Sequence, residues 1–352
     1  MTKLLPIAIL SILVCSPINS FAAEPDDKRT EIDQAVDKAL DFLHNQQNPD
    51  GSWNVWRGGK SPAITSLSVM AFLSAGSVPG EGKHGEAVQK GIEWVLKQQL
   101  PNGLIAGDAH HEMYHHGICT IMLSEVAGMT DGKLGEEVRQ KLEKAVQIIL
   151  KGQRTVGVEK GGWRYRVEGA DSDISVTGWQ LMALRAAKNL GCDVPPEAID
   201  RAVEYVKRCQ DPSTGGFRYM VRAGVTVPCT GTSILGLELC GKDEHRSPEV
   251  LKAGAFLLRN LPRWGDPHYF YSIYYCTQAT FQLGGNYWDA YRPRMQESLL
   301  KNQGDNGSWH GRFGEDQIYG PNYGTAMAVL ALTVEYRFLP IYQRGEEPTE
   351  KK

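Results

Sequence analysis

Two aspartates separated by a single residue, Asp171 and Asp173, stand immediately before an apolar, helix-like run. A neighbouring carboxylate and local hydrogen bonds tune the pKa of a carboxylic acid, so this pair is a candidate for proton-transfer chemistry. Asp and Ser are also the residues that commonly cap the first turn of a helix, as Asp173 or Ser172 would do here. The spacing leaves both interpretations open.

A histidine-rich segment, residues 110–116, contains the pattern HExxH, with His111 and His115 four positions apart. Histidines at this spacing share one face of a helix and can bind Zn²⁺, with Glu112 as a base. The segment falls at a junction between a loop and a helix, and no HxxGxxH extension follows it. We therefore predict no cofactor, and keep zinc at His111 and His115 as an alternative to a polar, hydrogen-bonded junction.

A third cluster is aromatic and begins just after Asp266, with five aromatic side chains in seven residues from Tyr269 to Tyr275. Aromatic faces stabilise cations, so this cluster is a candidate wall for a cavity in which positive charge develops. Packing against neighbouring helices is the alternative. The predicted wall residues from this cluster and the C-terminal region are Asp266, His268, Tyr269, Tyr271, Tyr274, Tyr319 and Tyr323.

These clusters occur at regular places because the chain repeats itself. A Gln followed closely by Gly and an aromatic or apolar residue occurs at Gln47, Gln99, Gln153, Gln210 and Gln303. An amphipathic helix-like stretch precedes each run and a more apolar one follows, which predicts outer helices with one wet face and buried inner helices. Six such pairs over residues 30–340 predict an all-α fold, an α6/α6 toroid, with the inner helices beginning around one end of a central cavity.

Small residues and glycines mark the inner helices. Small residues near each inner-helix start predict close helix approach, and a Gly after most of them predicts a C-cap. The predicted C-cap glycines are Gly76, Gly128, Gly191, Gly241 and Gly284. Short extended pieces are expected at Trp163–Tyr165 and Phe217–Tyr219, whose Arg164 and Arg218 are interpreted as solvated loop residues because their spacing specifies no phosphate site.

The repeats resemble the QW motifs of squalene–hopene cyclases, and the predicted toroid is that of terpenoid cyclases and protein prenyltransferase β subunits. The chain is similar in particular to the secreted single-toroid members of the prenyltransferase/squalene oxidase repeat family. The segments that carry this likeness are His115-His116-Gly117, Ser175-Val176-Thr177-Gly178-Trp179 and Tyr323-Gly324-Thr325-Ala326-Met327-Ala328. In the cyclases such repeats hold outer helices together, so Trp53, Trp163 and Trp309 are expected to be structural.

The resemblance also implies roles for individual residues. Asp171-Ser172-Asp173 resembles the DxDD signature of class II terpene cyclases, which protonate an alkene. By this match Asp173 is the proton donor and Asp171 its flanking partner. Ile174 departs from the signature, because the last Asp belongs at its position. Residues His115, His116 and Trp179 join the expected cavity wall.

The N-terminus is typical of a signal peptide: Lys3 is followed by the apolar run Leu4–Val14, and Ser20-Phe21-Ala22 provides a cleavage site. We predict a signal peptide over 1–22, an extension over 23–29, the toroid over 30–342 and a disordered tail over 343–352. Export follows from the signal peptide, and the six cysteines after it are expected to be mostly buried free thiols.

Composition narrows the partners. A formal net charge of -3 gives no electrostatic case for nucleic-acid binding. No later segment is long and apolar enough to predict an integral membrane protein. The sequence therefore predicts an exported toroid that binds an apolar, isoprenoid-type ligand, with class II cyclase or isomerase chemistry if it is an enzyme. A non-catalytic binding or scaffold module of the cell envelope and a His-dependent metalloenzyme are the alternatives.

Overall fold

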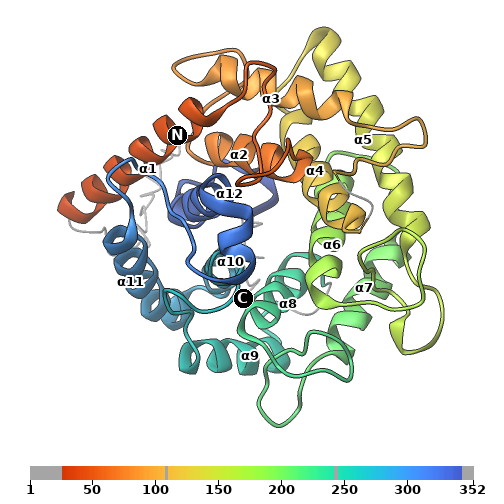
Figure 1. Ribbon diagram of the computed structural model, residues 1–352. Coiled ribbons are helices and arrows are strands. Elements are labelled where there is room, and N and C mark those ends of the chain that lie inside the picture. The colour runs from red at the N-terminus through yellow and green to blue at the C-terminus, as the bar shows by residue number, and fades with distance from the viewer. Residues whose placement is uncertain (1–25, 108–109, 242–244, 343–352) are drawn as a thin grey trace, which may run out of the picture.

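The computed structural model describes residues 26–107, 110–241 and 245–342, in which twelve α-helices form two concentric rings (Figure 1). The outer ring consists of α1 (Asp26–Gln46), α3 (Gly85–Lys97), α5 (Gly132–Gly152), α7 (Pro196–Arg208), α9 (Pro248–Arg259) and α11 (Gly285–Asn302). The inner ring consists of α2 (Pro62–Ser74), α4 (Glu112–Ala127), α6 (Ile174–Asn189), α8 (Val227–Cys240), α10 (Tyr269–Leu283) and α12 (Gly314–Leu332). Neighbouring inner helices contact one another, and α12 contacts α2, so the ring closes. The predicted α6/α6 toroid is confirmed.

The ends of the chain limit which predictions can be compared with the structure. The predicted signal peptide (1–22) and tail (343–352) lie outside the described residues. Helix α1 begins at Asp26, inside the stretch assigned from sequence to an extension. Within the described residues, no helix combines the length and the apolar character that crossing a bilayer requires.

The two rings differ in burial as their sequences predict. All 13 residues of α2 are buried, because this helix packs against other helices on every side. In α7 the buried positions include Ala198, Ile199, Ala202, Val203 and Val206, which lie on one face at helical spacing. The inner helices therefore form the core, and the outer helices shield it from water.

Inner helices approach closely where glycines replace larger residues. A Cβ added to Gly178 on α6 would lie 2.1 Å from Cγ2 of Thr232 on α8. A Cβ added to Gly231 on α8 would lie 2.9 Å from the backbone nitrogen of Cys276 on α10. The small residues of the repeat thus set the spacing of the inner ring.

Each repeated Gln makes the same pair of hydrogen bonds. Its side-chain Nε2 donates to the Gly carbonyl of its own turn and to a carbonyl of the next outer helix, as Gln47 does to Gly51 and Ala87. Gln303 bonds Gly307 and then Ala35 on α1, which links the last outer helix to the first. The acceptors on the neighbouring outer helices are Ala87, Lys141, Ala198, Glu249 and Ala35.

The repeated tryptophans are structural, as expected. Trp53, Trp163 and Trp309 are fully buried. The indole nitrogen of each donates to a carbonyl near the end of the preceding outer helix, Leu43, Ile149 or Leu299, over 2.7–2.8 Å. Their backbone nitrogens donate to threonine hydroxyls of the following inner helix, so each turn ties an outer helix to an inner one.

Some local predictions differ from the structure. Gly76, Gly191 and Gly284 have the positive φ of a left-handed cap or turn, but Gly128 (φ -86°) and Gly241 (φ -71°) do not. The expected extended pieces form isolated bridges such as Trp163 with Asp173, and no strand occurs in the described part of the chain. The six described cysteines are free, and five of them are buried.

Candidate functional site

The N-terminal ends of the inner helices gather at one end of the ring, and Asp173 caps α6 there. Its Oδ1 accepts hydrogen bonds from the backbone nitrogen of Val176 (2.9 Å) and from Oγ of Ser175 (2.6 Å). The side chain is 0% exposed. One of the two carboxyl oxygens of Asp173, Oδ1, therefore caps helix α6, as the capping interpretation predicts.

The second oxygen of Asp173 has a different environment. Oδ2 is buried and accepts no hydrogen bond, and Nε of Arg164 lies 3.4 Å from it. Arg164 pairs more closely with Asp171, at 2.5 Å between Nη1 and Oδ2. Burial raises the pKa of Asp173 above its ordinary value, although Ser175, the Val176 amide and Arg164 act in the opposite direction. A buried carboxyl with one oxygen free of hydrogen bonds is suited to hold a proton and to donate it.

Four tyrosines lie in the neighbourhood of this carboxyl, and we call Tyr114, Tyr165, Tyr219 and Tyr271 the mouth cluster. All four are partly exposed. The Tyr114 hydroxyl bonds Ser175, and its ring stacks on Tyr165 at 5.9 Å. Tyr165 and Tyr219 share a hydrogen bond of 2.5 Å between their hydroxyls.

Charge and aromatic faces meet in this cluster. The Arg164 guanidinium lies 4.9 Å from the centre of the Tyr165 ring and 5.8 Å from that of Tyr219. Tyr271 bonds Thr232 through its hydroxyl at 2.8 Å. Burial raises the pKa of Tyr271 far above its usual range, with a smaller contribution from nearby Tyr114. The cluster therefore presents phenol hydroxyls and π faces in the neighbourhood of Asp173.

Further inside the ring, the predicted wall residues form a continuous aromatic stack. Trp179 on α6 stacks on Tyr274 of α10 at 5.6 Å and 10°, and meets Tyr275 edge-on at 5.2 Å. Tyr271 joins the mouth cluster to this stack through Tyr275, at 4.7 Å between ring centres. Tyr323 lies against Phe270 (6.3 Å) and Tyr319 (5.4 Å), on the α12 side. These side chains fill the interior of the inner ring.

Three predicted wall residues lie at the start of α10 and make contacts with its loop, with α11 and with α12 instead. The Tyr269 hydroxyl bonds Ser298 of α11 at 2.7 Å, and Asp266 accepts from the backbone nitrogen of Arg263 within its own loop. His268 has a positive φ of 58° and pairs with Glu315 at 2.9 Å, which raises its pKa. None of these contacts involves the mouth cluster.

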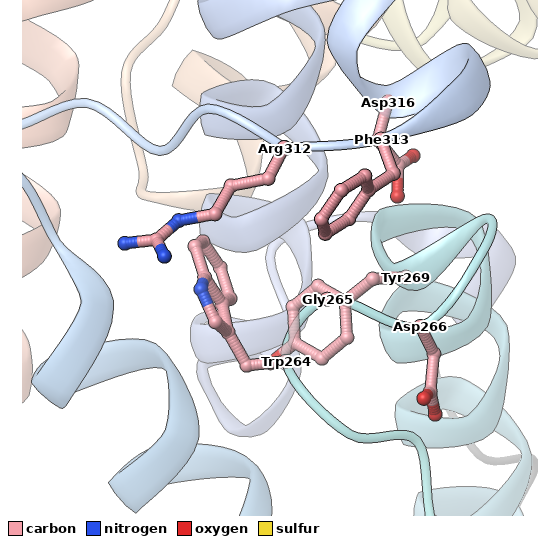
Figure 2. Close-up of a pocket in the computed structure, with 8 residues that line it drawn as sticks. Trp264, Gly265, Asp266, Tyr269, Arg312, Phe313 and Asp316 are labelled. Carbon is pink, nitrogen blue, oxygen red and sulfur yellow. The ribbon is translucent and has the colours of Figure 1, made fainter.

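The first turn of α10 is capped from another helix. Asp316 of α12 accepts from the Phe270 nitrogen at 3.4 Å, and burial raises the pKa of Asp316 to about 6. Figure 2 shows Asp316 beside Phe313 and Tyr269 at the edge of a small cavity of about 10 Å³. That volume is about what one water molecule needs. A second, more open cavity of about 270 Å³ lies between α1 and α11. Asp173 lines neither of these two cavities.

The histidine segment is divided among separate contacts. His111 meets the Tyr165 ring edge-on at 5.1 Å, while Glu112 accepts from the backbone nitrogen of Val167 at 2.7 Å. The His115 ring lies against Gly107, where an added Cβ would come within 2.4 Å of Cε1. Across the ranges that the structure describes, no group of three or more His, Cys, Asp or Glu side chains is placed to hold a metal ion.

His116 occupies a repeat position. Its Nδ1 accepts from the Ile105 nitrogen at 3.1 Å, where the equivalent turns use a threonine hydroxyl, and its Nε2 bonds the Ala145 carbonyl of α5 at 2.9 Å. Burial lowers the pKa of His116 to about 4, so the ring is neutral at pH 7. The side chain therefore faces the outer ring rather than the interior.

Sequence reasoning missed Arg164 and the tyrosines of the mouth cluster on α4 and the loops. Arg164 was interpreted as solvated, yet its side chain is only 22% exposed and contacts both aspartates. A signal was present, because Trp163-Arg164-Tyr165 and Phe217-Arg218-Tyr219 repeat one pattern at equivalent places. Arg218 pairs with Asp211 at 2.5 Å, as Arg164 does with Asp171.

Comparison with known proteins supports the resemblance seen in the repeats. No protein-family model matches the chain. It is 25% identical over 196 residues to drimenyl diphosphate synthase of Streptomyces showdoensis, which covers 56% of this chain and 33% of that protein. The chain spans a third or less of the length of the first curated relatives that it matches.

Solved structures share the architecture. The type II terpene cyclase MstE from Scytonema, in complex with its product merosterolic acid A, matches with a TM-score of 0.59 and 17% identity over 89% of this chain and 99% of that chain. An α-1,6-mannanase of Salegentibacter sp. HEL1_6 matches with a TM-score of 0.66 and 9% identity over 86% of this chain and 98% of that chain. The likeness to terpenoid cyclases is thus confirmed, while the toroid alone also serves a different chemistry.

Proposed function

We propose that this terpenoid-cyclase-like toroid binds an isoprenoid-type apolar ligand at the mouth cluster and isomerises it by class II chemistry. The observation that carries the proposal is the carboxyl of Asp173, fully buried, with Oδ2 free of hydrogen bonds. Similarity to terpene cyclases supports the ligand class. The proposal includes export, which rests on the N-terminal sequence alone.

In the proposed reaction, Asp173 transfers its proton from Oδ2 to one carbon of a ligand alkene, and the π electrons form the new C–H bond. The adjacent carbon becomes a cation that the phenol faces of the mouth cluster stabilise. Ring closure moves the positive charge along the chain, and water accepts a proton from the final cation, which regenerates an alkene. Proton transfer from solvent then restores the Asp173 acid. The reaction is a net isomerisation and needs no redox partner.

The surroundings of Asp173 also suit the carboxylate that remains after proton transfer. Ser175 and the Val176 amide already donate to Oδ1, and Arg164 lies near Oδ2. These groups stabilise the anion when it forms, which strengthens the acid, while burial acts in the opposite direction and raises the pKa of Asp173. Asp171 holds the Arg164 guanidinium at the shorter distance and so limits its pairing with Asp173.

Asp173→Asn tests the acid directly. Asn also serves as an N-cap, so the variant keeps the α6 terminus and removes the transferable proton. Purified protein is incubated with squalene and, separately, with geranylgeraniol, and products are separated by gas chromatography with mass detection. We expect cyclised product from the wild type and a loss of at least about 100-fold in D173N, the lower bound for removing a general acid.

Two results would count against this assignment. Cyclisation that survives in D173N would remove Asp173 as the acid. A wild type that forms no cyclised product from either substrate would contradict the catalytic proposal for both ligands. Equal melting temperatures of D173N and wild type are the control for folding.

A second candidate is a non-catalytic scaffold, favoured by the filled interior of the ring. Trp179, Tyr274 and Tyr275 are at most 2% exposed and pack on one another. A scaffold predicts that neither squalene nor geranylgeraniol shifts the melting temperature. A rise that saturates with ligand concentration would instead indicate a specific apolar site.

A further inference from the structure

The last described residues turn back into the ring. After α12 ends at Leu332, the chain forms the short helices η2 (Val334–Tyr336) and η3 (Pro340–Tyr342). Leu339, Ile341 and Tyr342 are 3–5% exposed. Their partners belong to three inner helices, because η3 contacts α6 and bonds to side chains of α4 and α10. The segment therefore lies inside the inner ring.

Specific hydrogen bonds hold this segment. The Ile341 nitrogen donates to Oε1 of Glu125 on α4 at 3.3 Å, and Nε2 of Gln282 on α10 donates to the Tyr342 carbonyl at 2.9 Å. The Tyr342 hydroxyl bonds that of Tyr274. Since Tyr274 stacks on Trp179, Tyr342 extends the same aromatic stack that Tyr271 and Tyr275 connect to the mouth cluster.

Glu125 is an unusual partner for such a segment. It is 3% exposed, and its Oε2 accepts no hydrogen bond. In the described part of the chain no Lys or Arg pairs with it. Tyr274 and Tyr342 are the titratable groups that face it, and burial raises the pKa of both above the usual range. An isolated buried carboxyl is stable only in its neutral form.

We propose that Leu339–Tyr342 is a displaceable intramolecular plug, seated in the inner part of the apolar ligand site and held by Glu125 and Gln282. The ligand class rests on the proposed function. The plug itself presents a phenol and apolar side chains to the aromatic stack, which is the chemistry of an apolar ligand bearing a hydroxyl group. Such a ligand takes the place of Tyr342 when the plug leaves.

Ionisation of Glu125 sets the direction of the pH dependence. Burial raises the pKa of Glu125 to about 8 with the plug in place, and exposure returns the pKa toward the ordinary 4.5. The open state therefore binds fewer protons at pH 5–8, so raising the pH favours opening. Between pH 6 and pH 9 these two values correspond to a gain of about 100-fold in the open fraction.

Hydrogen exchange of the Ile341 amide in the full chain measures this opening. Protection factors, corrected for the intrinsic rate at each pH, are compared at pH 6 and pH 9. We expect protection to fall about 100-fold at pH 9 in the wild type. Glu125→Gln is the matched control, because Gln keeps the acceptor for Ile341 and does not titrate, so its protection should be equal at both pH values.

Equal protection of the Ile341 amide at pH 6 and pH 9 in the wild type would overturn the role of Glu125 in holding the plug, without the need for any variant. An equal loss of protection at pH 9 in E125Q would overturn it as well. Farnesol, an apolar alcohol, tests displacement: we expect it to speed Ile341 exchange at pH 7, and an unchanged rate would show a fixed closure. These readouts need no catalysis. If the protein does not cyclise squalene but farnesol speeds Ile341 exchange, the Asp173 mechanism is rejected and the plug proposal stands.

Discussion

Arg164 determines how the two aspartates of the site differ. It takes Asp171 as its close partner and leaves Asp173 at 3.4 Å. Asp171 is exposed, whereas Asp173 is buried, and burial raises the pKa of Asp173. Two carboxyls of one tripeptide therefore have separate electrostatic roles, set by burial and by a single guanidinium.

His116 provides a prediction at the same scale. Its folded pKa of about 4 lies below the ordinary 6.5, so the unfolded chain binds more protons between these values and stability falls as the pH drops through this window. From pH 7.5 to pH 5 we expect about 2 kcal/mol of unfolding free energy to be lost through this residue.

His116→Thr is the comparison for this prediction, because threonine occupies the equivalent position in four other repeats: Thr65, Thr177, Thr230 and Thr325. Urea unfolding of both proteins at the two pH values isolates the titration, since other groups are common to both. H116T should be less pH-dependent by that amount. Parallel pH profiles would show that His116 does not titrate as its burial implies.

At the scale of elements, close packing of α6 against α8 depends on Gly178. Gly178→Ala places a methyl 2.1 Å from Cγ2 of Thr232, so a side chain must shift, and we expect a destabilisation of about 1–3 kcal/mol. Thr232→Ser removes the Cγ2 methyl of Thr232 and keeps the hydroxyl that bonds Tyr271.

Urea unfolding of G178A, T232S and the double variant checks this contact. The double variant should be more stable than the two single effects predict by addition, because the clash is absent from it. Additive effects would place the strain elsewhere.

Patterns of helical period were sufficient to predict the helix pairs and their two classes of burial. These patterns are local, as in α2, which is buried on all sides, and α7, which is buried on one face. Asp173 and the aromatic run of α10 were likewise found by their position at inner-helix starts. Arg164 was not, because its two partners become neighbours only after the loop folds. The Glu125–Ile341 contact was missed because it joins residues 216 apart.

At the scale of the whole molecule, closure of the ring depends on contacts between its first and last helices. Gln303 bonds Ala35, Asn322 bonds the Asn54 carbonyl, and Thr333 bonds Ser74. Gln303→Ala removes two hydrogen bonds, and we expect a loss of about 2 kcal/mol.

This loss should appear equally in circular dichroism and in tryptophan fluorescence, because Trp53 and Trp309 lie on either side of the closure. Gln140→Ala, on the exposed face of α5, is the matched control and should change stability by less than about 0.5 kcal/mol. If fluorescence reported an earlier transition than circular dichroism in Q303A, the ring would not be one cooperative unit.

One of the six junctions in the ring lacks the glutamine turn. Between α9 and α11, a hydrogen bond from the Tyr287 hydroxyl to the Leu251 carbonyl joins the two helices directly. The loop of residues 260–268 is therefore not needed to link these outer helices. In evolutionary terms the length of this loop is less constrained than that of the other five turns, whose glutamines join neighbouring outer helices. A designer who alters the length of a connection in the ring should therefore begin at this loop, because the link between the outer helices α9 and α11 does not pass through it.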